Sequence, residues 1–417
     1  MYLDTAESTP DAPPLAGDAR ADALVVGAGF TGLSTALHLA LGGASVLLAD
    51  AETIGHGASG RNGGQVNAGL KHDPDEVERT FGAERGARLN EFAGGAPEFT
   101  FQLIERLGIR CEARRQGTLR AAVHPRHVAE VMRCTAEWRR RGAPVEFLGR
   151  AEIAAATGCT RYGGALLDRR GGDLNPLSYA RGLARAALAA GARIHGATRI
   201  EALERTSAGW RARHARGAID AARVVIATNG YSDDLWPGLR RSVVPVYSTI
   251  VATEPLPESI SRAILPGRQV LYESGSLTVY YRIDAAQRLL IGGRGPMREI
   301  AGPSEIPHLL AYARKLWPAL ATVRWTHGWG GCLAMTRDQY PHLHQPADGI
   351  LMALGYNGRG VALGVALGAE LAKRTLDPKA ELPIPVSAIR TIPLHRLWPL
   401  AVKAAILRGR IADRLGR

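Results

Sequence analysis

The sequence predicts a mixed α/β fold in which an α/β domain with a parallel sheet is interleaved with a second, β-rich domain. Near the start, an apolar run at 23–26 leads into a glycine-rich turn, an apolar helical pattern and a second strand that ends at Asp50. Strand and helix patterns return in the middle and last thirds, where apolar strands cover 224–227 and 349–354. Between them, residues 236–325 hold prolines and alternating Val, Tyr and Thr residues, which are typical of antiparallel β-structure.

The other elements follow from periodicity and from turn signals. Asn175-Pro176 starts a helix that continues to Ala189, with proline at an early position where its missing N–H costs nothing. The small residues after Gly360 predict a helix through Leu371. The remaining expected elements are amphipathic helices at about 75–91 and 96–107, and strands at 44–49, 118–123, 193–195, 277–283 and 289–291.

These elements divide the chain into domains. The composition of the first twenty residues, rich in Asp, Pro and Ala, predicts a disordered leader. The expected segments are 1–20 for the leader, 21–95, 150–235 and 326–385 for the α/β domain, 96–149 and 236–325 for the β-rich domain, and 386–417 for a basic amphipathic tail. From Arg396 onwards the tail has six basic residues and one acid. Packing on its own domain is the favoured interpretation, and contact with a membrane surface is the alternative.

Composition excludes several classes of protein. The net charge of +13 comes from arginine, since only five of the 52 basic residues are lysines. The arginines are scattered and form no known nucleic-acid module, so we expect no nucleic-acid partner. The four cysteines are far apart and the histidines lack ligand spacing, which predicts no metal site. Reduced thiols and the lack of a long apolar run predict a cytoplasmic location.

The glycine-rich turn predicts a site for the phosphates of a dinucleotide. Its residues are Gly27, Ala28, Gly29, Phe30, Thr31 and Gly32. Gly27 permits the tight turn, Gly29 lets the backbone approach a pyrophosphate, and Gly32 lets the helix pack on the strand. Asp50 lies eighteen residues past Gly32 at the end of the next strand, where a carboxylate is expected to bind a ribose hydroxyl. The turn alone leaves the choice between FAD and NAD open.

A second loop follows at 57–65, with the sequence GASGRNGGQ. Nearly all of its residues are glycine or polar, in a chain with 46% hydrophobic residues. Such a loop brings backbone N–H groups close to a ligand, and a planar polar ring would fit it.

With this loop the sequence resembles the D-amino-acid-oxidase-like family of FAD oxidoreductases, and within it the branch that contains γ-glutamylputrescine oxidase. Three further segments carry the resemblance: ATNGY at 227–231, Trp329-Gly330-Gly331 with Thr336-Arg337-Asp338, and GYNGRG at 355–360. It covers nearly the whole chain after the leader. It implies a Rossmann-type FAD-binding domain interleaved with a β-rich substrate domain. FAD is expected to be non-covalent, because Cys332 is shifted by one residue from the place where sarcosine oxidases attach their flavin.

The resemblance also implies a set of cofactor-binding residues. The residues expected to line the pyrophosphate, the ribityl chain and the isoalloxazine are Ser59, Arg61, Asn62, Gly63 and Gly64. Those expected near the phosphates and the adenosine half are Thr228, Asn229 and Gly230. Those expected to aim a helix N-terminus at the flavin N1/O2 edge are Gly355, Asn357, Gly358, Arg359 and Gly360. A helix N-terminus stabilises the negative charge that reduced flavin carries at N1.

The family's reaction is removal of a hydride from a carbon that bears an amine, followed by hydrolysis of the imine. The flavin performs the redox step, so the sequence identifies no catalytic residue. Amino-acid oxidases of this family place a carboxylate-binding arginine where this chain has Leu333. This departure favours an amine substrate, such as a γ-glutamylated or other polyamine-like amine, with Arg282 or Arg294 as a substitute anchor.

Two tyrosines complete the expected substrate site. Tyr280, Tyr281 and Arg282 lie on a predicted strand, where they form either an aromatic wall against the flavin or the ordinary alternation of a sheet. We expect the electron acceptor to be O2 or quinone. The alternatives to an amine oxidase are a D-amino-acid or imino-acid dehydrogenase that passes electrons to quinone, and a non-catalytic nucleotide-binding regulator.

Overall fold

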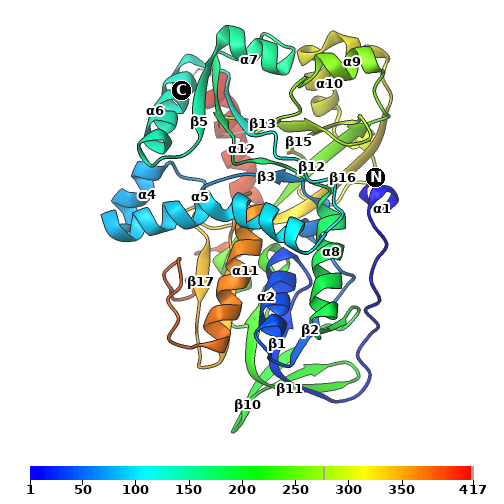
Figure 1. The fold of residues 1–417 in the computed structure, drawn as a ribbon, viewed down its shortest axis with the longest axis vertical. Coiled ribbons are helices and arrows are strands. Elements are labelled where there is room, and N and C mark those ends of the chain that lie inside the picture. Colours follow the sequence, from blue (N-terminus) through cyan, green and yellow to red (C-terminus); the bar gives the residue numbers. More distant parts are fainter. Residues whose placement is uncertain (276–277, 415–417) are drawn as a thin grey trace.

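The computed structural model describes residues 1–275 and 278–414, and of residues 410–414 the backbone alone. The described chain forms two large sheets, one below the other in Figure 1, with the long helix α5 (Ala83–Arg106) crossing between them. The lower half is of the parallel α/β type and the upper half is mainly antiparallel. The predicted mixed fold with two interleaved halves is confirmed.

The first sheet has a parallel centre. Its order is β17-β18-β11-β1-β2-β8, and β10 and β9 extend it from β11. β1 pairs in parallel with β2 and with β11, so the carboxyl ends of these strands meet at one edge. All of β2 is buried, as expected for a strand that is covered on both faces. The strands are β1 (Ala19–Val26), β2 (Val46–Ala49), β8 (Arg193–His195), β9 (Ala202–Thr206), β10 (Gly209–His214), β11 (Gly217–Ile226), β17 (His342–His344) and β18 (Ile350–Leu354).

Three helices lie side by side over one face of this sheet: α2 (Phe30–Leu41), α8 (Pro176–Ala189) and α11 (Gly360–Leu376) (Figure 1). Their apolar residues join those of α5 in the largest hydrophobic core. Hydroxyls of α2 also bond to carbonyls of α11, from Ser34 to Val365 at 2.7 Å and from Thr35 to Gly368 at 3.0 Å. The segment after β1 and the segment after β18 are thereby held together.

The second sheet has the order β16-β12-β15-β14-β13-β4-β6-β5. Adjacent strands in this sheet are antiparallel, except that β13 and β4 run in parallel. One face packs on α10 around Tyr162, Tyr281 and Trp317, and the other faces the first half of the molecule. The strands are β4 (Thr118–Ala122), β5 (Val145–Gly149), β6 (Gly164–Asp168), β12 (Val244–Thr253), β13 (Val270–Glu273), β14 (Tyr280–Ile283), β15 (Leu289–Arg294) and β16 (Trp325–Met335).

Short elements join the two halves. The pair β3 (Gln65–Val66) and β7 (Gly172–Asp173) is antiparallel and follows the loop at 57–65. The remaining helices are α1 (Tyr2–Thr5), α3 (Ala58–Arg61), α4 (Pro74–Phe81), α6 (Pro125–Arg140), α7 (Arg150–Thr157), α9 (Glu258–Ala263), α10 (Pro307–Leu316), α12 (Trp398–Arg414) and the 3-10 turns η1 (Asn229–Tyr231), η2 (Arg240–Ser242), η3 (Pro303–Glu305), η4 (Pro318–Thr322) and η5 (His395–Leu397).

The sheets divide the chain differently from the expected domain boundaries at two places. β6 lies at 164–168, inside the segment expected for the α/β domain, but it pairs with β4 and β5 in the second sheet. β16 begins at the expected boundary near residue 326, yet it pairs with β12 along the second sheet. Both strands join by long-range pairing, which a local sequence pattern does not reveal.

Three local expectations also need correction. Residues 1–20 are ordered: Tyr2 is buried, and its hydroxyl donates to the Asn62 carbonyl at 3.0 Å. The helix expected at 75–91 is interrupted at Gly82, which has φ +84°, and α5 then continues through Pro97. The strand expected at 277–283 is present from Tyr280, and Leu277 lies outside the described residues.

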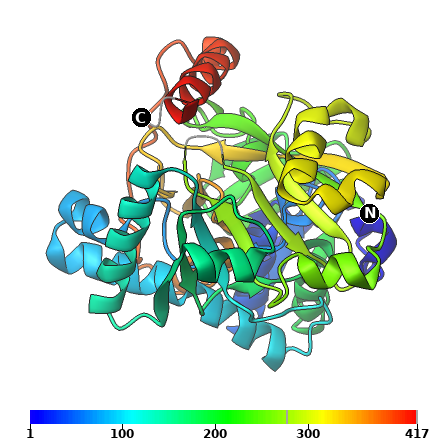
Figure 2. The same ribbon diagram turned by 90° about the horizontal axis from the view of Figure 1, so that it is seen from above.

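The tail ends in α12, which lies at the edge of the molecule, in red, in Figure 2. Its exposed side chains include Leu400 and Leu407, and Leu394 and Leu397 just before it are exposed as well. Among the helices of the described residues, none is long and apolar enough to cross a membrane.

Candidate active site

The glycine-rich turn joins β1 to α2, as predicted. A Cβ on Gly32 would lie 1.8 Å from the Gly27 carbonyl oxygen, so only glycine lets the helix approach the turn this closely. The N-cap of α2 is Gly29, which has no side chain to cap the helix. The start of α2 therefore offers its N–H groups and the positive end of its dipole to an anion.

Asp50 and Ser59 bond to this turn. One Asp50 carboxylate oxygen accepts from the Ala28 N–H at 2.5 Å and the other from the Glu52 N–H at 2.8 Å. The Ser59 hydroxyl accepts from the Phe30 N–H at 2.9 Å. The structure thus brings the turn, the end of β2 and the second loop together, while the expected contact of Asp50 with a ribose stays a prediction.

The second loop forms the short helix α3 and then a tight turn. The Asn62 amide donates to the Ala58 and Ser59 carbonyls, and its oxygen accepts from the Gly64 N–H at 2.7 Å. Gly64 has φ +73°, and a Cβ there would lie 2.1 Å from the Leu174 carbonyl oxygen. This backbone course therefore requires glycine. The guanidinium of Arg61, also in the expected set, is ion-paired with Glu299.

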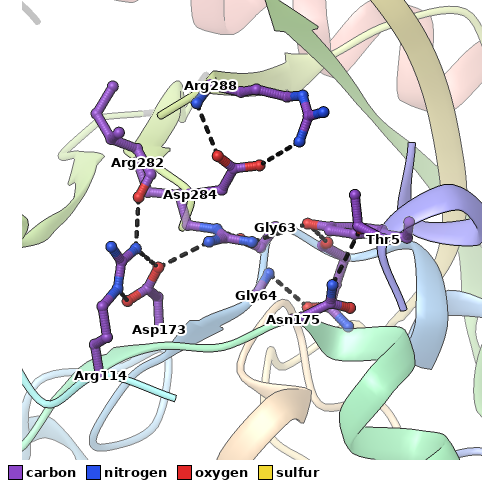
Figure 3. Close-up of polar contacts among 12 residues, drawn as sticks. Thr5, Gly63, Gly64, Arg114, Asp173, Asn175, Arg282, Asp284 and Arg288 are labelled. Carbon is purple, nitrogen blue, oxygen red and sulfur yellow. Dashed lines mark hydrogen bonds and ion pairs between the residues drawn. The ribbon is translucent and has the colours of Figure 1, made fainter. Parts of the chain in front are cut away.

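Arg282 holds this loop through a hydrogen bond to its backbone and is not free to bind a substrate. Its guanidinium donates to the Gly63 carbonyl at 2.6 Å and to Asp173 at 2.8 Å (Figure 3). It also donates to the Tyr2 hydroxyl at 3.3 Å. Arg114 binds the same carboxylate with two further bonds. Because Asp173 is fully buried and Arg282 is 3% exposed, the expectation that Arg282 anchors a substrate is wrong.

Tyr281 also differs from the expectation. It is fully buried on the far face of the second sheet, where its hydroxyl lies 3.0 Å from that of Tyr162 and its ring packs on Trp317. It therefore contributes to the core of the second half and not to a wall against the flavin. Successive residues of a strand point to opposite faces, which places Tyr280 on the side of the cofactor segments.

Tyr280 belongs to a row of side chains that crosses the second sheet. Strand register aligns Gly292, Tyr280, Tyr272, Arg120 and Leu166, in that order. A Cβ on Gly63 would lie 2.8 Å from the Tyr280 ring, so this row faces the loop at 57–65. Tyr272 and Arg120 are candidate site residues that the sequence did not reveal, because only the cross-strand register brings them beside Tyr280.

Arg359 reaches this row from the first half of the molecule. It is the N-cap residue of α11, and its guanidinium donates to the Tyr272 hydroxyl at 2.8 Å and lies 4.7 Å from the centre of that ring. A small pocket at this junction is lined by Asp73, Arg120, Tyr272 and Arg359, among others. The pocket places the start of α11 against the tyrosines of the second sheet.

The turns at 228–230 and 355–360 are bonded to each other. The Asn229 side chain accepts from the Gly355 N–H at 2.9 Å, and the Tyr356 hydroxyl lies 2.7 Å from that of Thr31. Asn357 has φ +52°, and its side-chain oxygen accepts from the Thr336 N–H at 3.0 Å. The sequence-predicted segments therefore form one continuous cradle, and ligand contacts of Thr228, Gly230, Gly358 and Gly360 stay predictions.

Leu333 and Cys332 lie on β16 beside this cradle. Leu333 is half-buried and pairs in register with Val246, two residues along from Gly331. A Cβ on Gly331 would lie 3.3 Å from the Arg61 Cβ, so this face of β16 looks toward α3. Leu333 is apolar, so this position offers no charge to a substrate carboxylate. The buried Cys332 thiol points the other way, with its sulfur 3.4 Å from the Gly230 carbonyl oxygen.

The cradle fits FAD in its chemistry. The N-cap residues of α2 and α11 make no side-chain cap bond, and neither helix has an acidic residue in its first turn. Apart from the Phe30 N–H, which Ser59 engages, the first N–H groups of both helices suit negative charge. One N-terminus suits a pyrophosphate, and the other, with Arg359, suits the N1 edge of a reduced flavin.

Comparisons with known proteins agree with this architecture. The family model described as FAD dependent oxidoreductase (DAO) matches residues 22–374. Gamma-glutamylputrescine oxidoreductase of Escherichia coli is 33% identical over 371 residues, which cover 87% of this chain and 86% of that protein. Glycine oxidase of Geobacillus kaustophilus is 26% identical over 85% of this chain and 93% of its own length. The crystal structure of glycine oxidase from Geobacillus kaustophilus superposes with a TM-score of 0.76 at 23% identity, covering 90% of this chain and 99% of that one. The chain belongs to the DAO family of FAD-dependent oxidoreductases.

Proposed function

We propose that this enzyme oxidises a C–N bond of an amine. The product is an imine, which water then hydrolyses to a carbonyl compound. The observation that carries the proposal is the contact between Arg359 and Tyr272. It joins the anion-stabilising end of the cofactor domain to an aromatic wall of the second sheet. FAD, when bound, supplies the chemistry of hydride acceptance.

The residues of the chain then orient the amine and favour its neutral, unprotonated form. Tyr272 and Tyr280 offer flat faces that hold a substrate against the cofactor loop and exclude water. Burial raises the pKa of Tyr280 to about 12, and its hydroxyl lies 2.8 Å from that of Ser248, so it remains a neutral phenol. The nearby arginines disfavour a protonated amine, which favours the neutral form that gives up a hydride.

We propose that FAD is held without a covalent bond to Cys332. Attachment requires a thiolate, and burial raises the pKa of this thiol to about 11. The sulfur also lies within hydrogen-bond distance of the Gly230 carbonyl. Mass spectrometry of the denatured protein is expected to show the bare chain, and a mass increment equal to FAD would refute this arrangement.

A γ-glutamylated or other polyamine-like amine is the proposed substrate. The similarity to gamma-glutamylputrescine oxidoreductase supports it, as does the absence of a cation at Leu333. Anaerobic mixing of the holoenzyme with a panel of amines and amino acids tests it. We expect bleaching of the flavin absorbance with amines and little with free α-amino acids, and the reverse order would overturn the assignment.

A second candidate is a D-amino-acid or imino-acid dehydrogenase that passes electrons to quinone. Helix α12 has exposed leucines and, among them, the basic residues Lys403 and Arg408. This combination favours contact with a membrane surface, where quinone resides. Peroxide formed in air with an amine supports an oxidase. Reduction of a quinone analogue without peroxide, lost when 386–417 are removed, supports the dehydrogenase.

A further inference from the structure

Four cations lie around the wall formed by Tyr272 and Tyr280. Arg120 and Arg359 line the pocket beside it, Arg294 lies on the neighbouring strand β15, and Lys71 is close enough to feel the charges of all three arginines. Arg120 stands in the cross-strand row, bonded to Asp73 at 2.6 Å and to the Ser274 hydroxyl at 3.1 Å. Arg359 bonds to the Tyr272 hydroxyl. Within the described residues, no carboxylate lies at ion-pair distance from Lys71, Arg294 or Arg359, and Asp73 is the acid engaged by Arg120.

Strand geometry directs Arg294 to the cofactor side of the sheet. It lies two residues after Gly292, where a Cβ would be 2.3 Å from the Tyr280 ring. Because side chains alternate along β15, the Arg294 side chain lies on the same face of the sheet as Tyr280. Its strand partner is Ser248, whose hydroxyl is bonded to that of Tyr280. Arg294 is half-buried and burial lowers its pKa, as for a guanidinium that lacks a counter-charge.

Lys71 approaches the same place from the segment that follows β3. The neighbouring residues Leu70, His72 and Asp73 line the pocket that Arg120, Tyr272 and Arg359 also line. The Lys71 side chain is exposed, yet enough protein surrounds its ammonium group that desolvation is the largest effect lowering its pKa to about 8. The charges of Arg359, Arg120 and Arg294 lower it further, and Asp73 opposes them.

The charges at this place do not balance. Asp168 also lines the pocket but is paired with Arg170, so the four cations face the one carboxylate of Asp73. The negative charge of a reduced flavin would offset one more cation. Two positive charges remain beside a wall that binds an organic substrate. Unpaired charges in a partly desolvated site are costly, and an anion that pairs with them is bound strongly.

We propose that Lys71 and Arg294 bind a carboxylate of the substrate, so that the enzyme selects amines that carry an acidic group away from the reacting C–N bond. This inference rests on the proposed amine oxidation and narrows its substrate class. Arg282 cannot serve, since it is bonded to Asp173, and Leu333 offers no charge. A free diamine, with a second ammonium group, is disfavoured by the same cations.

A matched pair of substrates tests the proposal. N-succinyl-1,4-diaminobutane and its terminal carboxamide have the same length and amine and differ only in the carboxylate. Both probes are mixed with the holoenzyme in anaerobic stopped flow. We expect the probe with the carboxylate to reach half-maximal flavin reduction at a concentration at least about 10-fold lower than the probe with the carboxamide, as for loss of a charged hydrogen bond. Arg294→Met and Lys71→Met are expected to remove this preference. Lys315→Met, which deletes an exposed charge on α10, is the control that keeps it.

A binding assay separates this inference from the proposed function. 4-Acetamidobutanoate carries the carboxylate but no oxidisable amine, and its binding is followed by the flavin absorbance spectrum. We expect the wild type and Lys315→Met to bind it, and both site variants to bind it at least about 10-fold more weakly. If no amine bleaches the flavin, amine oxidation is refuted, and this assay still decides the anion site. If both probes reduce the flavin equally and the site variants bind the carboxylate as the wild type does, the anion site is wrong.

Discussion

The guanidinium of Arg359 donates to the hydroxyl of Tyr272 at 2.8 Å and lies 4.7 Å above that ring. Arg359 is the N-cap residue of the helix that follows the last strand of the cofactor half, and Tyr272 stands in the middle of the second sheet. Sequence separation between them is large, so the bond exists only when both halves are assembled. It fixes the positive end of α11 against the aromatic wall.

Removal of this charge is expected to lower the midpoint potential of the bound flavin. Arg359→Met deletes a cation at a helix N-terminus, where such effects amount to about 0.3–2 kcal/mol. The reduced flavin loses stabilisation relative to the oxidised one, so the potential falls. Spectroelectrochemical titration measures it. Arg374→Met, at the other end of α11, is the control, and an unchanged potential in Arg359→Met would contradict the role assigned to this residue.

The buried ion pair behind the flavin loop is expected to be essential for stability. Arg282→Met leaves Asp173 buried with one partner, and breaking a buried pair in this way costs about 3–5 kcal/mol. Urea unfolding followed by circular dichroism measures the loss. The exposed pair Arg211–Asp220 is the matched control, since its removal changes stability little. A loss no larger than the control's would show that the pair does not support the loop.

Carboxylate binding is expected to weaken as the pH rises. Lys71 is protonated below its pKa of about 8 and neutral above it. Its contribution to anion binding is therefore present at pH 7 and is lost on titration through pH 8 to 9. The dissociation constant of 4-acetamidobutanoate, measured between pH 6.5 and 9.5, records this change. Lys71→Met should flatten the profile in that range, and an identical profile in the variant would remove Lys71 from the site.

Gly64→Ala is expected to abolish FAD retention. The new Cβ would lie 2.1 Å from the Leu174 carbonyl oxygen, in a backbone with φ +73°. The loop would have to move from its bonds with Asn62 and Arg282. Gly43→Ala has a similar φ of +83° but nothing within 4 Å, so it separates backbone strain from the clash. The ratio of flavin to protein absorbance after gel filtration gives the result, and equal ratios in the two variants would count against the clash.

Local patterns predicted the cofactor half well, because its signals are contiguous. Gly27, Gly32 and Asp50 all belong to one strand–helix–strand unit. Their spacing predicts the observed turn and its bond to Asp50. The site in the second half was harder to predict. Tyr280, Tyr281 and Arg282 are adjacent in sequence, yet sheet alternation separates Tyr281, and the buried Asp173 engages Arg282.

Other site residues depend on register between distant strands. Arg120 and Tyr272 align only because β4 and β13 pair in parallel, which no local signal indicates. Lys71 lies in an irregular segment, and only its surroundings distinguish it from a surface lysine. The order of residues 1–20 likewise comes from a distant partner, since Tyr2 is buried against Trp329 and bonded to Asn62.

A single anaerobic turnover tests amine oxidation most directly. The holoenzyme is mixed with one equivalent of N-succinyl-1,4-diaminobutane, and both the flavin absorbance and the carbonyl product are quantified. Amine oxidation predicts one carbonyl group for each flavin reduced, because the two electrons leave with the hydride of one C–N carbon. Flavin that no amine reduces, or that a hydroxy acid reduces instead, would contradict the account.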